Sequence, residues 1–69
     1  MDRRKKLGAK VVYFRKLKAI TQKELAEQVG VSRQYLSRLE HGQCECCLEM
    51  IYNLAGVLNV EPEELIKDL

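Results

Sequence analysis

The chain has 69 residues, of which 46% are hydrophobic and 32% are charged, an ordinary balance for a small globular protein. This composition argues against a disordered tail, and no apolar run is long enough to span a bilayer, so we expect no membrane segment. The basic start is typical of a signal peptide, but lysines and arginines interrupt the stretch that follows, which favours a cytoplasmic protein. Because a domain this small buries only about 60% of its unfolded surface, residues 1–69 are expected to share one core.

The net charge of +2 is unevenly distributed. Residues 1–18 carry Asp2 as their only acidic residue and these basic residues: Arg3, Arg4, Lys5, Lys6, Lys10, Arg15, Lys16 and Lys18. From Cys44 onward the sign of the charge reverses. Lys67 is the only basic residue of this stretch, and its acidic residues are Glu45, Glu49, Glu61, Glu63, Glu64 and Asp68. One end of the molecule could therefore lie near a polyanion that would repel the other end, although two solvated helix faces would give the same pattern.

The first predicted helix covers about residues 4–18, where apolar residues recur as on one helical face: Leu7, Val11, Phe14 and Leu17. The second begins after Thr21, because a threonine followed three residues later by Glu24 is the reciprocal capping pattern. Gly30 ends it, since glycine adopts the left-handed conformation without a steric cost. Its buried face is supplied by Leu25, Ala26 and Val29.

Three further helices follow in the same way. The third spans about residues 32–41, begins at Ser32 as N-cap, and turns Leu36 and Leu39 inward before Gly42 stops it. A fourth apolar stripe comprises Leu48, Ile51, Leu54, Ala55 and Leu58. Pro62 suits the first turn of a last helix that continues over residues 63–69. No segment alternates with the period of a strand, so the predicted fold class is a compact all-α domain of five helices.

Residues 21–40 place two short helices around a glycine turn, with the small Ala26 where the helices cross. This is the spacing of a helix-turn-helix, with the motif at about residues 22–41. The sequence resembles the Cro and phage-repressor (XRE) family of helix-turn-helix regulators from about residue 7 to residue 65. The resemblance is carried by Arg15, Ile20, Gln22, Leu25, Ala26, Gly30, Val31, Ser32, Leu36, Ser37, Glu40, Gly42, Leu54, Ala55, Leu58 and Val60.

The resemblance implies a phage-repressor-like fold and a transcriptional regulator that binds double-stranded DNA sequence-specifically. It also implies an ion pair between Arg15 and Glu40 that holds the third helix against the first. If this pair is exposed, it contributes little, about 0–1 kcal/mol.

An α-helix fits the major groove of B-DNA, where arginine bonds guanine and glutamine bonds adenine. The residues expected to read bases are Arg33, Gln34, Ser37 and Arg38. Contacts to the DNA phosphates are expected from Gln22 and the amide of Thr21, because a helix N-terminus favours anions. Weaker phosphate candidates are Ser32, Tyr35, His41 and Gln43, and partial packing is an equal alternative for Tyr35. The basic block at residues 3–6 either approaches DNA or is a solvated terminus.

A regulator of this type is expected to bind near-palindromic operator DNA as a homodimer. Late apolar residues are candidates for the interface, with core packing as the alternative: Leu58, Val60, Ile66 and Leu69. A second class of function is an antitoxin-type module whose acidic C-terminal half contacts a protein partner.

Cys44, Cys46 and Cys47 are the main departure from the family pattern. They could bind metal or sense redox state, but their spacing lacks paired Cys-x-x-Cys knuckles, so free thiols are expected, with Cys47 capping the next helix. No metal and no cofactor are predicted. His41 is the only histidine and no nucleophile can be paired with a base, so we predict no enzymatic activity.

Overall fold

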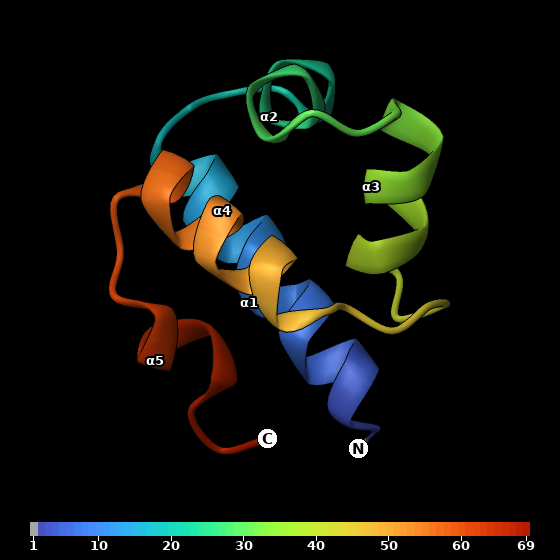
Figure 1. The fold of residues 1–69 in the computed structure, drawn as a ribbon, viewed down its shortest axis with the longest axis vertical. Coiled ribbons are helices and arrows are strands. Elements are labelled where there is room, and N and C mark those ends of the chain that lie inside the picture. The colour runs from blue at the N-terminus through green and yellow to red at the C-terminus, as the bar shows by residue number, and fades with distance from the viewer. Residues whose placement is uncertain (1) are drawn as a thin grey trace.

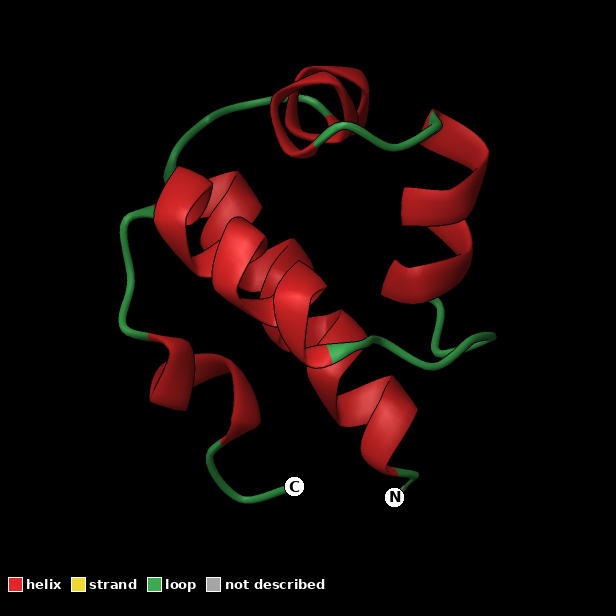
Figure 2. Cartoon of the chain, viewed as in Figure 1, coloured by secondary structure: helices red, strands yellow, loops and turns green. Residues whose placement is uncertain are grey.

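Helix α1 (Arg3–Leu17) runs diagonally through the molecule, with α4 (Leu48–Leu58) beside it (Figure 1). The computed structural model describes residues 2–69, and over this range α2 (Gln22–Val29), α3 (Arg33–Glu40) and α5 (Pro62–Ile66) complete the fold. Helices α2 and α3 form one side, α5 packs on α1 and α4 at the other, and loops make all the connections (Figure 2). Residues 2–69 contain no strand, as the all-α prediction requires.

Local capping bonds explain where the helices begin. The Asp2 carboxylate accepts a hydrogen bond from the Arg4 amide at 2.7 Å, and the Ser32 hydroxyl accepts one from the Tyr35 amide at 3.0 Å. At the start of α2 the predicted capping box is present: the Glu24 amide donates to Thr21 Oγ1 at 3.0 Å, and the Thr21 amide donates to Glu24 Oε1 at 2.7 Å. Cys47 is the N-cap residue of α4, as expected, but its side chain makes no capping bond.

Side chains from all five helices meet in one core: Leu7, Val11, Leu25, Ala26, Leu36, Leu39, Ile51, Leu54, Ala55, Leu58 and Leu65. Leu17 was predicted to join them and is instead 65% exposed. It is the last residue of α1, and the chain turns away after it so that Ile20 packs against the core in its place.

Gly8 allows α1 to approach the end of α3 unusually closely. A Cβ atom at this position would lie 2.4 Å from the carbonyl oxygen of Glu40 and 2.6 Å from that of Leu39. The obstruction is backbone, which cannot move aside as a flexible side chain could. The absence of a side chain at Gly8 therefore sets the distance between these two helices.

The last helix is shorter than predicted, because α5 ends at Ile66 and residues 67–69 are not helical. Lys6 of α1 donates to the carbonyl oxygen of Asp68 at 3.2 Å, and Lys10 donates to that of Lys67. These bonds occupy carbonyls of the C-terminal segment and tie it to α1. None of the helices formed within residues 2–69 is both long and apolar enough to cross a membrane.

Candidate nucleic-acid interface

Helices α2 and α3 cross each other through a short turn at residues 30–32 (Figure 1). Gly30 has a φ of 80°, the left-handed conformation that lets the chain leave α2 without a steric penalty. Buried Leu25 and Ala26 of α2 and Leu36 of α3 fill the inner side of the pair. This is the arrangement of a helix-turn-helix, and it leaves the opposite side of α3 facing solvent.

The solvent side of α3 carries long polar side chains. Arg33, Gln34 and Arg38 are exposed, and Ser37 is half-buried beside them. Positions three to four residues apart lie next to one another on a helix, so these side chains form one continuous surface. No hydrogen bond to another group within residues 2–69 engages the side chains of Arg33, Gln34 or Arg38, so all three remain available to a ligand.

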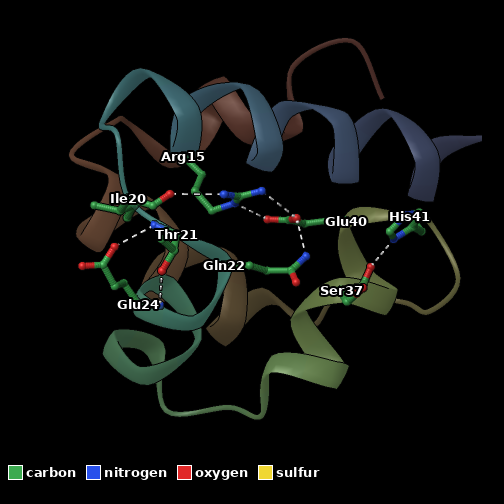
Figure 3. Close-up of polar contacts among 8 residues, drawn as sticks. All are labelled: Arg15, Ile20, Thr21, Gln22, Glu24, Ser37, Glu40 and His41. Atoms are coloured by element: carbon green, nitrogen blue, oxygen red, sulfur yellow. Dashed lines mark hydrogen bonds and ion pairs between the residues drawn. The ribbon is translucent and has the colours of Figure 1, made fainter.

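Besides Gln22, whose side chain is described below, three of the predicted phosphate contacts already have partners in the protein. The Ser32 hydroxyl accepts a hydrogen bond from the Tyr35 amide. The Thr21 amide donates to Glu24, and His41 Nδ1 lies 2.7 Å from the carbonyl oxygen of Ser37 (Figure 3). The Thr21 amide is thus committed to the capping box, whereas the Ser32 hydroxyl keeps its own proton to donate.

The two remaining weaker candidates differ in their surroundings. Tyr35 is half-buried against the core, and desolvation, followed by the charges of the nearby cysteines, raises the pKa of its phenol. Gln43 is exposed and its backbone amide bonds the Arg38 carbonyl oxygen at 2.9 Å. Tyr35 therefore packs and keeps its proton, while the side chain of Gln43 faces solvent.

Behind α3 lies a polar network of three side chains from three helices (Figure 3). Arg15 Nε donates to Glu40 Oε2 at 2.8 Å, Arg15 Nη2 donates to Oε1 at 3.2 Å, and Gln22 Nε2 donates to the same Oε1 at 2.9 Å. Arg15 Nη1 also donates to the Ile20 carbonyl oxygen at 3.1 Å, just before α2 begins.

The Arg15–Glu40 pair is largely buried. Only 14% of the Arg15 side chain and 3% of the Glu40 side chain are accessible, so the figure for exposed pairs does not apply. Removing one partner of a buried pair leaves an uncompensated charge and typically costs about 3–5 kcal/mol. The ion pair therefore fixes the end of α3 against α1, and the contact from Gln22 to Glu40 is one that sequence reasoning missed.

The residues proposed for a dimer interface divide into two groups. Leu58 is 2% exposed and belongs to the core, which is the alternative that the sequence left open for it. Val60 is half-buried, whereas Ile66 and Leu69 are 41% and 37% exposed. Other exposed apolar side chains were not foreseen: Tyr13, Leu17, Leu48 and Tyr52.

The cysteine loop connects α3 to α4. Cys44 and Cys46 are half-buried, Cys47 is exposed, and all three are free thiols. Burial, reinforced by the neighbouring Cys47 and Cys44, raises the pKa of the Cys46 thiol to about 11, which keeps it protonated at neutral pH. Within the described residues 2–69 no three His, Cys, Asp or Glu side chains are placed to hold a metal ion. A nearby pocket of about 200 Å³, lined by residues that include Leu7, Ile51 and Leu69, is smaller than the roughly 300–1,000 Å³ of most small-molecule sites.

Comparisons with known proteins agree with this geometry. The model of the helix-turn-helix family matches residues 12–65. An uncharacterized HTH-type transcriptional regulator, y4dJ of Sinorhizobium fredii, is 39% identical over 66 residues, covering 96% of this chain and 86% of that protein.

Two solved structures share the fold at appreciable identity. The restriction-modification controller protein C.AhdI from Aeromonas hydrophila superposes with a TM-score of 0.86 at 35% identity, covering 90% of this chain and 94% of that one. The P22 c2 repressor, crystallised in complex with a synthetic operator, superposes with a TM-score of 0.82 at 31% identity, covering 88% and 92%. The chain therefore belongs to the helix-turn-helix family of transcriptional regulators, of the Cro and phage-repressor (XRE) type.

Proposed function

We propose that this regulator binds near-palindromic operator DNA as a homodimer in the cytoplasm, with α3 lying in the major groove. The observation that carries the proposal is the solvent side of α3, where Arg33, Gln34 and Arg38 are exposed and make no bond to the rest of the described chain. Similarity to the P22 c2 repressor, which was crystallised with operator DNA, supports the same partner.

The chemistry of the α3 surface suits base recognition. The arginine fork donates two hydrogen bonds to O6 and N7 of guanine, and the glutamine amide pairs with N6 and N7 of adenine. Arg33, Gln34 and Arg38 would make these contacts, and the shorter Ser37 would act beside them. Sequence preference would come from this group, because contacts to phosphate carry no base information.

Contacts to the DNA backbone would come from residues around the two helix starts and the end of α3. Gln22 is the first residue of α2, where unpaired amides and the helix dipole favour an anion. Thr21, through its hydroxyl, would assist Gln22, and further phosphate bonds would come from Ser32, Tyr35, His41 and Gln43. These contacts would supply affinity that is largely independent of sequence.

For the dimer, Ile66 and Leu69 are the exposed apolar residues that support an interface, with half-buried Val60 at its edge. Two copies related by a two-fold axis would place their reading helices in successive major grooves, about 34–36 Å apart for helix-turn-helix proteins. A palindromic operator mirrors that symmetry.

Titrating two variants against two DNA duplexes tests this assignment. One duplex is a high-affinity site selected from random DNA and the other is a scrambled sequence. Arg38→Ala should cost about 1–3 kcal/mol on the selected site and much less on the scrambled one, because it removes a base contact. Gln22→Ala should weaken both duplexes by similar factors. All titrations use one salt concentration, because salt shifts the electrostatic background steeply.

Equal weakening of both duplexes by Arg38→Ala would contradict the proposed orientation of α3. Retention of full affinity for both by the two variants would contradict DNA binding through this face altogether.

A further inference from the structure

Glu40 is placed to do more than brace α3. Its carboxylate is nearly inaccessible, yet one oxygen, Oε1, accepts a hydrogen bond from the half-buried Gln22 at the start of α2 at 2.9 Å. Glu40 is the last residue of α3 and Gln22 the first of α2, so this bond joins the two ends that frame the proposed DNA-binding face (Figure 3).

The chemistry of the bond decides which way the Gln22 amide faces. An ionised carboxylate only accepts hydrogen bonds, so the nitrogen of the amide, and not its oxygen, must face Glu40. The opposite orientation would set two oxygens against each other. Glu40 is itself held by two bonds from Arg15, which also donates to the Ile20 carbonyl oxygen. The amide nitrogen is therefore held in a fixed place at the N-terminus of α2.

A fixed amide nitrogen matters for binding an anion. The nitrogen carries two protons, of which one bonds Glu40 and the other remains free. A phosphate oxygen also accepts only, so the amide must present a proton to it. Holding the group in place before DNA arrives removes the entropy cost of ordering a flexible side chain.

We propose that Glu40 is a positioning residue for DNA binding: its carboxylate, held by Arg15, orients the Gln22 amide so that its free proton faces a DNA phosphate. This inference rests on the proposed function, because it assumes that Gln22 contacts DNA. It adds that the contribution of Gln22 to affinity depends on Glu40, which a purely structural brace would not require.

The test compares the effect of Gln22→Met in two backgrounds. The first is the native chain, and the second carries Arg15→Met and Glu40→Met together. Replacing both members of a buried ion pair by apolar residues is often neutral for stability, and this pair of changes leaves the net charge unaltered. Affinities for the selected and scrambled duplexes are measured where circular dichroism shows every variant folded.

In the native background Gln22→Met should weaken both duplexes by about three- to tenfold, the range expected for losing one hydrogen bond. In the double-methionine background the same change should have less than about a twofold effect, because the amide is no longer oriented. An equal factor in the two backgrounds would overturn the inference while leaving the phosphate contact intact. No effect in either background would overturn both the contact and the inference.

A second measurement needs only the native protein, and so does not depend on the folding of the variants. Gln28, exposed on the same helix, is the matched reference for Gln22. In the NMR spectrum of the free protein, the side-chain amide protons of Gln22 should exchange more slowly than those of Gln28, and one should be shifted downfield by the carboxylate. Indistinguishable exchange and shifts for the two side chains would overturn the orienting bond.

Discussion

At the level of single residues, Gly8 controls the spacing of α1 and α3. The position at which a Cβ would form lies 2.4 Å from the backbone oxygen of Glu40, well inside any real contact. Gly56 is a useful contrast, because it lies within α4, is exposed, and a Cβ there would meet nothing within 4 Å. Both glycines are helical and both lose backbone entropy on folding, so the difference between them is one of space alone.

Substituting alanine at these two positions should therefore change stability in opposite directions. Gly8→Ala should lower the free energy of unfolding by about 1–3 kcal/mol or more, because the two backbones must separate. Gly56→Ala should raise it by about 0.5–1 kcal/mol, because alanine is the better helix former. Urea unfolding followed by circular dichroism measures both values. A stable Gly8→Ala variant would contradict the close approach of α1 to α3.

Some contacts of individual residues could not be predicted from the sequence. Gly8 sits inside an amphipathic pattern, and nothing in the pattern marks the backbone that approaches it. The bond from Gln22 to Glu40 joins residues 18 positions apart, and only the crossing of α2 and α3 brings them together. Arg15 and Glu40 were paired through the family resemblance, but their burial depends on how three helices converge.

At the level of the helices, short-range chemistry made the sequence predictions accurate. The capping box at Thr21, the left-handed Gly30 and the Ser32 cap are local signals, and they place the two helices of the motif within one residue of the expected bounds. The periodic stripe predicted α4 equally well. Predictions that depended on long-range packing failed: Leu17 is exposed and α5 ends early.

The capping box of α2 makes stability depend on pH. The hydrogen bond from the Thr21 backbone, followed by that with the Thr21 side chain, lowers the pKa of Glu24 below its ordinary value of 4.5. The folded state thus favours the charged carboxylate, and its stabilising effect is present above about pH 4.5 and lost as the pH falls through the lowered pKa.

Glu24→Gln should therefore lower the melting temperature at pH 7, and the difference from the native protein should shrink as the pH falls toward 3. Thermal melts across this range measure the convergence. Glu27→Gln, which removes an exposed carboxylate of α2 outside the capping box, controls for the loss of one charge. A difference in melting temperature between Glu24→Gln and the native protein that stays constant with pH would contradict the assigned role of the carboxylate.

At the scale of the whole molecule, the basic N-terminal block is largely occupied by the protein itself. Arg3 pairs with Glu45 and Arg4 with Asp2, each at 3.2 Å, and Lys6 donates to the Asp68 carbonyl oxygen. Because these cations already have partners within the protein, we expect the positive charge that meets DNA to come from α3 and not from residues 3–6.

The salt dependence of DNA binding distinguishes these two sources of charge. Affinity decreases with salt, and the plot of log affinity against log salt becomes shallower by about one for each cation that no longer neutralises a phosphate. Arg3→Ala/Arg4→Ala and Arg33→Ala/Arg38→Ala each remove two positive charges, so they are matched for net charge. We expect the first variant to change the slope by less than about 0.5, and the second to reduce it by about one to two. A reduction of one or more in the first variant would place the N-terminal block on the DNA, since its exposed ion pairs are weak enough to exchange carboxylate for phosphate.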